Sequence, residues 1–234
     1  SKNIRRSFWY SGEILCAEVY RPLILNDVEA LALSSSIRAQ LQVDDDIKIA
    51  LYAPTFRRDY TLTTYALEYE IISDELSKKF GGEWCVLMRL HPNVSHLQSN
   101  LVFTNKVKNG SVFPSISELL VVSDVLITDY SGSMFDAFRI NKPVFLYGTD
   151  YEEYIHSDRK LYFDLKDLPA SFSKSTQELI DAIEAFDVEE YEKRAKEFVE
   201  EIGYYNNDGI SMICECIEKY IGRKNDYRIH NRSI

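Results

Sequence analysis

The chain has 234 residues, a formal net charge of −10 at pH 7, 45% hydrophobic residues, 16 Tyr and 12 Phe. This content excludes a disordered chain and suits one large compact domain, or one domain with a fragment of another. The acidic balance argues against nonspecific binding to DNA or RNA, because the overall field would repel their phosphates.

The four cysteines have neither the spacing of a zinc knuckle nor the density of a secreted disulfide framework, so we expect reduced thiols and no zinc site. The three adjacent carboxylates at 44–46 are expected to form a solvated turn, with a metal site as the weaker alternative. No apolar run reaches the roughly 18 residues that a membrane span needs, and the N-terminus lacks a signal-peptide core. The first residue is Ser, so we expect a processed product or a piece of something longer.

Taken in order, the chain alternates between short apolar runs and amphipathic segments. The first 40 residues show no clean period, although 26–41 is compatible with a helix. Buried strands are predicted at 47–52, 84–90, 101–104, 125–128 and 142–147. Helices are predicted at 67–80, after Ser115, after Ser131, and at 176–186, 188–201 and 209–221, with a loop at 150–168. This alternation predicts an α/β fold with a Rossmann-like, doubly wound parallel sheet.

The stretch 123–136 carries the first candidate site. Its strand at 125–128 runs into Ser131, Gly132 and Ser133, which we expect at a helix N-terminus. Free N–H groups and the helix dipole favour a phosphate there, and glycine lets a ligand approach the backbone. The alternative is an ordinary strand-turn-helix whose serines only cap the helix, and this segment alone does not decide between the two.

Three loops are predicted to meet, because parallel strands place their carboxyl ends on one edge of the sheet. The chemistry-bearing residues of these loops are Thr55, Arg57, His91, Asp129, Ser131 and Ser133. A guanidinium, an imidazole and a helix N-terminus together would clamp a phosphate. Arg57 is equally suited to a surface salt bridge, and His91 could merely satisfy a strand end. Asp136 could accept a hydrogen bond from a ribose or a loop amide, or simply favour the dipole.

Six segments resemble, in order, the successive motifs of CDP-glycerol glycerophosphotransferases, the teichoic-acid primases and polymerases of the bacterial cell wall. They are 52–57 (YAPTFR), 90–93 (LHPN), 123–131 (SDVLITDYS), 135–136 (FD), 141–143 (NKP) and 207–209 (NDG). A looser match at 159–164 has Lys160 where the family usually has Gly. Six collinear motifs between about residues 45 and 222 are far more specific than any one of them.

The resemblance implies the C-terminal, donor-binding half of a GT-B fold. It implies a remnant of, or linker from, the acceptor-side domain at 1–44, a donor-nucleotide domain at 45–222 and a tail at 223–234. His91 matches the catalytic histidine at the donor phosphates, which assists departure of CMP. The donor-binding residues it implies are Thr55, Arg57, Asp129, Ser131, Gly132, Ser133 and Asp136. Gly132 departs from the family, which usually has a second serine there.

The family's other essential histidine lies in a His-Gly motif of the acceptor-side domain, and none of the four histidines here precedes glycine. We therefore expect the donor-binding half of a longer transferase, inactive as a fragment, or a stand-alone relative that needs a partner. The expected reaction is transfer of glycerol phosphate from CDP-glycerol to a teichoic-acid or related polymer or lipid-linked acceptor, releasing CMP.

Several alternatives stay open at this point. The donor is CDP-ribitol or a nucleotide sugar in one alternative, and the chain is a non-catalytic interaction module in another. No cofactor is expected beyond the substrate, while the need for a divalent metal, the acceptor, and primase versus polymerase action are undecided. The resemblance implies a cytoplasmic location, at the inner face of the membrane in the intact protein, although no basic amphipathic helix is evident.

Overall fold

The structure is a computed structural model that describes residues 25–57, 66–91, 93–94, 101–157, 161, 163–202, 214–219 and 221. The chain divides into two compact units, one made of Ser1–Arg21 with Val199–Ile234 and the other of Pro22–Phe198. In the first unit the described residues 199–202 and 214–219 are helical. The second unit carries the sheet, whose elements are given below. The domain bounds expected from the sequence stay a prediction.

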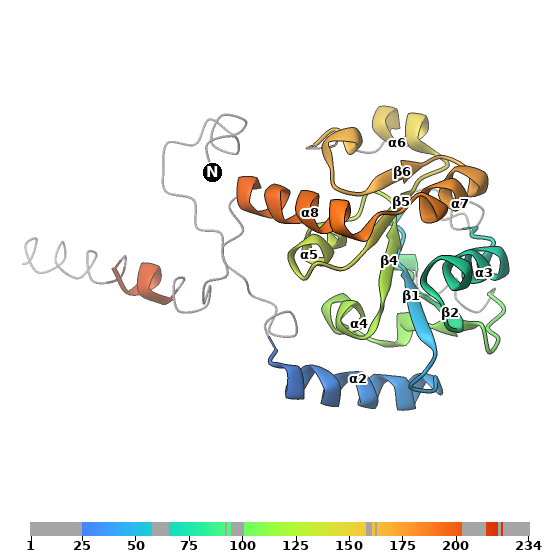
Figure 1. The fold of residues 1–234 in the computed structure, drawn as a ribbon. Coiled ribbons are helices and arrows are strands. Elements are labelled where there is room, and N and C mark those ends of the chain that lie inside the picture. The colour runs from blue at the N-terminus through green and yellow to red at the C-terminus, as the bar shows by residue number, and fades with distance from the viewer. Residues whose placement is uncertain are drawn as a thin grey trace, which may run out of the picture. The chain divides into compact units, whose positions relative to one another are not determined.

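Six parallel strands form one sheet in the order β3-β2-β1-β4-β5-β6 (Figure 1). The strands are β1 Lys48–Tyr52, β2 Trp84–Met88, β3 Val107–Asn109, β4 Val125–Thr128, β5 Val144–Tyr147 and β6 Ser171–Ser173. In the register Tyr52 pairs with Met88 on one side and Ile127 on the other, so the central strands end level. This is the doubly wound order, and it reverses direction at β1 and β4, where such folds place their ligand crevice. The predicted fold class is confirmed.

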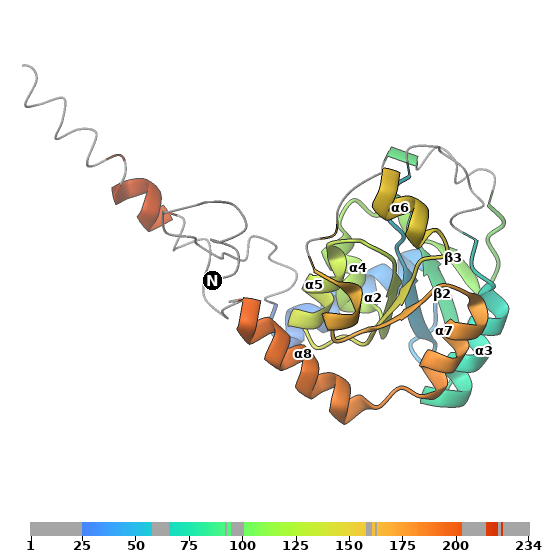
Figure 2. The same ribbon diagram turned by 90° about the horizontal axis from the view of Figure 1, so that it is seen from above.

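Helices cover both faces of the sheet (Figures 1 and 2). Helices α3 (Tyr69–Phe80) and α7 (Thr176–Glu184) lie on one face. Helices α4 (Ile116–Val122) and α5 (Ser133–Arg139) lie on the other, and α2 (Asp27–Leu41) packs on α4. The remaining elements are α6 (Tyr151–Ser157), α8 (Val188–Ile202) and two short 3-10 turns at Gly110–Val112 and Leu165–Asp167.

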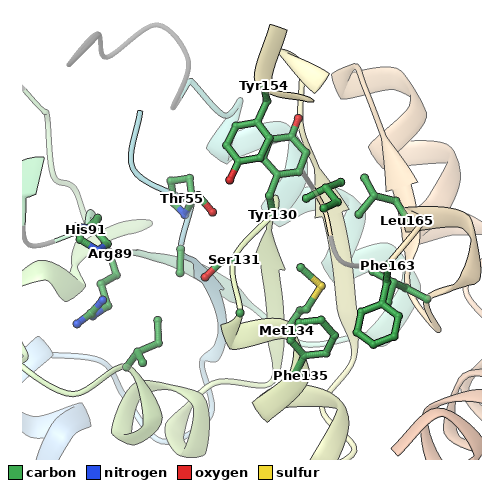
Figure 3. Close-up of a pocket in the computed structure, with 16 residues that line it drawn as sticks. Thr55, Arg89, His91, Tyr130, Ser131, Met134, Phe135, Tyr154, Phe163 and Leu165 are labelled. Atoms are coloured by element: carbon green, nitrogen blue, oxygen red, sulfur yellow. The ribbon is translucent and has the colours of Figure 1, made fainter. Parts of the chain in front are cut away.

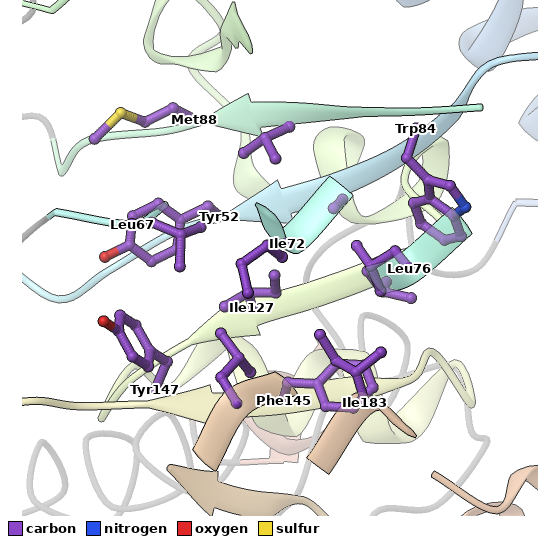
Figure 4. Packing of buried hydrophobic residues seen from close by; sticks show 14 of the residues in the cluster. Tyr52, Leu67, Ile72, Leu76, Trp84, Met88, Ile127, Phe145, Tyr147 and Ile183 are labelled. Carbon is purple, nitrogen blue, oxygen red and sulfur yellow. The ribbon is translucent and has the colours of Figure 1, made fainter. Parts of the chain in front are cut away.

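A hydrophobic cluster fills the space between the sheet and the pair α3 and α7 (Figure 4). Alternate strand residues point into it, because side chains of a strand face opposite sides of the sheet. Tyr52, Met88 and Ile127 contribute to this cluster from three neighbouring strands. Leu76 of α3 and Ile183 of α7 contribute to it from the helices. The four central strands, β2, β1, β4 and β5, are buried on both faces, which explains why their sequences are continuous apolar runs.

Local signals set where several helices begin and end. Asn26 and Glu29 form a reciprocal capping box at the start of α2, so the helix compatible with 26–41 is confirmed. Ser115 and Ser175 each accept a backbone N–H from the residue three positions on, at the starts of α4 and α7. Gly81 ends α3 at φ 70°, a conformation that favours glycine.

Three sequence predictions differ from the structure. The strand predicted at 101–104 is wrong, because Thr104 instead turns the chain: its Oγ1 accepts the N–H groups of Lys106 and Val107, and β3 starts only after that turn. The predicted loop at 150–168 contains α6, and the edge strand β6 was not predicted. Of the helix predicted at 209–221, residues 214–219 and 221 are helical and the others lie outside the described residues.

Cysteine placement agrees with reduced thiols where it is described. Cys85, Cys214 and Cys216 are free, while Cys16 lies outside the described residues. Burial raises the pKa of the Cys85 thiol to about 11, so this group stays protonated and unreactive near neutral pH.

Candidate functional site

A cavity of about 380 Å³ opens at the carboxyl edge of the sheet, beside the point where the strand order reverses (Figure 3). Loops after β1, β2 and β4 form one side, and α5, α6 and the segment after α6 form the other. The lining residues are Ala53, Pro54, Thr55, Arg89, His91, Ile116, Tyr130, Ser131, Gly132, Met134, Phe135, Tyr154, Leu161, Phe163, Leu165 and Leu168. The volume is in the range of small-molecule sites.

The cavity has two chemically different ends (Figure 3). Thr55, Arg89, His91 and Ser131 gather on one side of it, and they offer hydroxyls, an imidazole and a guanidinium. On the other side the lining is apolar, with the thioether of Met134 and aromatic rings. Such a cavity suits a ligand with an anionic group at one end and a flat or apolar group at the other.

The carboxylate of Asp129, directly after β4, holds the loop after β1 in place. Asp129 is 1% exposed, and its Oδ1 accepts the N–H of Thr55 at 2.8 Å, the Oγ1–H of Thr55 at 2.6 Å and the N–H of Tyr130 at 2.6 Å. Its Oδ2 accepts Nη2–H of Arg57 at 2.8 Å. Asp129 therefore does not line the cavity but fixes Thr55, which does.

Arg57 is also outside the cavity lining. Its Nη2 donates to Asp129, and its Nε and Nη2 donate to Asp150 at 2.6 and 3.0 Å. The Cζ atom lies 5.0 Å from the ring centroids of both Tyr130 and Tyr154, a cation–π arrangement. Burial alone would lower the pKa of Arg57, but the two carboxylates raise it above its usual value, so the guanidinium stays charged. The salt-bridge interpretation weighed from the sequence is thus the one observed, in a buried rather than a surface form.

Asp150 and the tyrosines complete this buried network. Asp150 accepts the Tyr130 hydroxyl at 3.1 Å, and Tyr130 stacks on Tyr154 with centroids 4.0 Å apart. Burial would raise the pKa of Asp150, but the hydrogen bonds and charge of Arg57 outweigh it and hold the pKa below the ordinary 3.8. Burial, together with the charges of Asp150 and Asp129, raises the pKa of Tyr130 well above 10.0, so this phenol stays neutral.

His91 is exposed at the rim of the polar end, beside the ring of Phe56 at 5.7 Å. Its Nδ1 accepts the backbone N–H of Asn93 at 3.2 Å, so the neutral imidazole carries its proton on Nε2. Partial burial and the charge of Arg89 lower the pKa of His91 below 6.5. At neutral pH the ring is therefore an uncharged donor.

The serine-rich turn contributes Ser131 to the polar end of the cavity. Ser131 lines it and accepts a hydrogen bond from Ser133 Oγ at 3.0 Å. Gly132 also lines it, with a helical φ of −58°, and a Cβ added there would meet nothing within 4 Å, so the serine usual in the family would fit here. Ser133 begins α5, and Asp136 lies half-buried in its first turn; neither is among the lining residues.

The structure thus brings together Thr55, His91, Ser131 and Gly132, as predicted, and places Arg57, Asp129, Ser133 and Asp136 outside the lining. The role of each in binding stays a prediction. Sequence reasoning missed Arg89, although it precedes His91 by two positions at the end of a strand. It also missed the aromatic end, whose residues come from 134–135 and 154–168, a region it read as a helix and a loop.

Comparison with known proteins adds the family. The model of CDP-Glycerol:Poly(glycerophosphate) glycerophosphotransferases matches residues 24–218. The chain belongs to this family. It is 33% identical over 169 residues to the teichoic acid poly(glycerol phosphate) polymerase of Bacillus subtilis (strain 168), covering 71% of this chain and 22% of that one. It is also 33% identical over 142 residues to the teichoic acid poly(ribitol-phosphate) polymerase of Bacillus spizizenii, covering 59% of this chain and 22% of that one.

Solved structures agree with these family relatives. The wall teichoic acid polymerase TagF superimposes with a TM-score of 0.70 and 29% identity, covering 96% of this chain and 56% of that one. This glycerophosphotransferase-family chain therefore spans about a fifth of the curated relatives above and about half of the solved one. The predicted family and transferase-type fold are confirmed.

Two absences hold for the described residues alone. No helix among them is both long and apolar enough to cross a bilayer. In the same part of the chain no three His, Cys, Asp or Glu side chains gather as a metal site would require.

Proposed function

We propose that this chain is the donor-binding part of a transferase that moves glycerol phosphate from CDP-glycerol to a teichoic-acid or related polymer or lipid-linked acceptor, releasing CMP. One observation carries the proposal: in a chain of this family, Thr55, His91 and Ser131 line the polar end of a single cavity whose other end is aromatic and apolar. Neither end alone would favour a nucleotide over other anionic or apolar ligands.

The two ends match the two ends of a cytidine diphosphate. The cytosine ring would lie against the apolar and aromatic residues around Phe135 and Phe163, where stacking stabilises a flat base. The diphosphate would then reach Ser131 and His91, whose hydroxyl and Nε2–H donate to phosphate oxygens. This orientation leaves the glycerol at the open rim, where an acceptor can approach.

The chemistry of this placement is phosphoryl transfer. An acceptor hydroxyl attacks the β-phosphorus, the bond from that phosphorus to the bridging oxygen breaks, and CMP leaves with the electron pair. His91 Nε2–H donates toward the departing phosphate and stabilises the charge that develops there. The base that takes the hydroxyl proton belongs, in the resemblance, to a His-Gly motif that this sequence does not contain, so we propose that another segment or partner supplies it.

Isothermal titration of the 234-residue chain tests the proposal. CDP-glycerol and CMP should both bind, and His91→Ala and Ser131→Ala should each weaken CDP-glycerol binding by about 10-fold, the factor for one lost charge-assisted hydrogen bond. Lys106→Gln, which removes a cation paired with Asp74 outside the cavity, serves as the control and should leave binding unchanged. Absence of heat with every cytidine nucleotide would overturn the proposal.

A second donor is favoured by one observation, the match to a ribitol-phosphate polymerase at the same identity as the match to a glycerol-phosphate polymerase. In the proposed orientation the polyol lies at the open rim, so the cavity itself would admit either donor. A thermal-shift series with CDP-glycerol, CDP-ribitol and nucleotide sugars separates them, because the preferred donor raises the melting temperature most at equal concentration. No shift with any of them would favour a non-catalytic interaction module.

We also propose that the intact protein works in the cytoplasm at the inner face of the membrane, without a cofactor. The proposed acceptor supports the location, because a lipid-linked acceptor would be anchored in the membrane. Fractionation of cells that express the full-length protein, with and without high salt, tests peripheral attachment.

A further inference from the structure

The cavity has one permanent charge among the side chains described as lining it, and that charge belongs to Arg89. The other guanidinium of this edge, Arg57, faces two carboxylates at 2.6 to 2.8 Å and is 5% exposed. Among the described residues, the charge of Arg57 is thus already balanced by Asp129 and Asp150. A diphosphate entering the cavity would therefore find its cation at Arg89.

The backbone of Arg89 is fixed by a hydrogen bond, whereas its guanidinium group makes only one to the described residues. Its backbone N–H donates to Tyr52 O at 2.8 Å, which extends the pairing of β1 and β2 and fixes where the side chain starts. Its Nη2 donates to Pro114 O at 3.1 Å, while its Nε is enclosed and has no hydrogen-bond partner among the described residues. Burial lowers the pKa of Arg89, and no carboxylate among the described residues offsets that effect. An anion that offered oxygens to the terminal nitrogens of this guanidinium would therefore balance a charge that the described part of the fold leaves unpaired.

Arg89 and His91 lie side by side at the polar end, both at the carboxyl end of β2 (Figure 3). The two residues share one side of that strand's extension, being two positions apart. A phosphate group placed between Ser131 and His91 is therefore near the guanidinium as well, and planar guanidinium groups bind phosphate oxygens in pairs.

We propose that Arg89 supplies the guanidinium that binds the donor diphosphate, whereas Arg57 is a positioning residue that holds the loops around the cavity. This inference rests on the proposed function and deepens it, because it assigns the charge that recognises the phosphates to a residue outside the donor-binding set implied by the motifs. The hydroxyls and the imidazole then orient the diphosphate, and Arg89 provides most of the preference for a charged ligand over a neutral one.

A ligand series that varies only in phosphate tests the assignment. The 234-residue chain is titrated with cytidine, CMP, CDP-glycerol and inorganic pyrophosphate. Arg89→Gln should weaken CDP-glycerol and pyrophosphate binding by about 10- to 100-fold and leave cytidine binding unchanged, because only the phosphate contacts are lost. Arg89→Lys should lose less, since it keeps the charge without the planar fork.

Two further variants separate phosphate binding from structure. Arg57→Gln should lower the melting temperature and weaken cytidine and CDP-glycerol binding by the same factor, as expected of a positioning residue. Lys106→Gln removes one positive charge near the opposite edge of the sheet. It should change neither the cytidine affinity nor the CDP-glycerol affinity. Should Arg89→Gln fail to fold, the ratio of CDP-glycerol to cytidine affinity in Arg89→Lys, which keeps the charge, decides instead.

The outcomes distinguish this inference from the proposed function. If the unchanged chain binds pyrophosphate through Arg89 but no cytidine compound, the proposed function fails, and only the assignment of Arg89 as a diphosphate-binding residue stands. If the chain binds CDP-glycerol and the Arg89 variants keep the same preference over cytidine, the assignment is overturned and the proposed function stands. Binding of neither pyrophosphate nor any cytidine compound would overturn both.

Discussion

A single buried carboxylate, that of Asp129, organises the polar end of the cavity without entering it. It accepts hydrogen bonds from Thr55, Tyr130 and Arg57, so three different parts of the edge depend on one side chain. The resemblance gave Asp129 a role in donor binding. Its contacts give it a structural role that is sufficient to explain its place between strand and turn.

Asp129→Asn should therefore destabilise the fold by about 3 kcal/mol, the low end for breaking a buried ion pair, because Asp150 still pairs with Arg57. Urea denaturation measures this. The matched control is Asp74→Asn, which breaks a 3.4 Å ion pair whose carboxylate side chain is 63% exposed and should cost less than about 1 kcal/mol. Equal costs for the two variants would show that the buried network contributes no more than a surface pair.

At the scale of elements, the turn between β5 and α6 shows how close packing fixes the site. A Cβ on Gly148 would lie 2.7 Å from Tyr130 Cζ and 3.1 Å from Phe172 Cε2. Only glycine at this position therefore leaves room for the tyrosine ring to pack on the backbone of the turn. The same ring donates its hydroxyl to Asp150 and stacks on Tyr154 of α6. The turn, α6 and the loop after β4 are thus packed as one piece.

Gly148→Ala should cost about 1–3 kcal/mol, because the added methyl group forces the Tyr130 ring away from Asp150. Thermal denaturation and tyrosine fluorescence report the change. Gly132→Ala is the control: a Cβ there meets nothing within 4 Å, so the variant should be as stable as the unchanged chain or slightly more so. A stable Gly148→Ala would mean that the ring moves at no cost.

The elements also show which features the sequence could predict. Strands β1, β2, β4 and β5 are buried on both faces and carry an unmistakable apolar run, and caps such as Ser115 mark helix starts. The edge strands β3 and β6 have three residues each, with mixed burial, so no pattern distinguishes them from turns. The parallel topology correctly predicted that Thr55, His91 and Ser131 lie at one cavity, because that prediction needs only the direction of the strands.

The partners of Arg57 could not be predicted in this way. They are 72 and 93 residues away in the sequence, and nothing local distinguishes an arginine that will meet two carboxylates from one that will face a ligand. Arg89 could not be predicted because it lies just before the 90–93 motif, and nothing in the local sequence shows that its side chain lines the cavity. Both outcomes depend on side-chain placement at the edge, which strand direction leaves undetermined.

At the scale of the whole molecule, the chain carries a net charge of −10 and is expected to bind a ligand that is itself an anion. The overall field opposes such binding, so local positive charge at the cavity has to offset it. Arg89 supplies one charge at all accessible pH values, and His91 beside it supplies a second only when protonated.

CDP-glycerol binding should therefore strengthen as pH falls from about 8 to about 6. The pKa of His91 lies below 6.5 in the free chain, and a bound diphosphate would raise it, so binding takes up a proton in the window between the two values. The charged group that faces the imidazole is Arg89, whose charge does not change in this range. Titration at several pH values measures the slope.

His91→Gln should abolish most of the dependence of CDP-glycerol affinity on pH. Salt at about 0.5 M, where the Debye length is roughly 4–5 Å, should reduce the contribution of distant charges to that affinity. Affinity that is independent of pH in the unchanged chain would contradict the expected proton uptake.

The contacts of Arg57 also constrain how relatives of this chain can diverge. One guanidinium joins the ends of three strands, β1, β4 and β5, through carboxylates far apart in the sequence. A substitution that removed the arginine would leave two like charges enclosed together, so it should be inherited together with a neutral residue at position 129 or 150. Correlated replacement of these three positions across evolution would be the inherited trace of a contact that no single motif reveals.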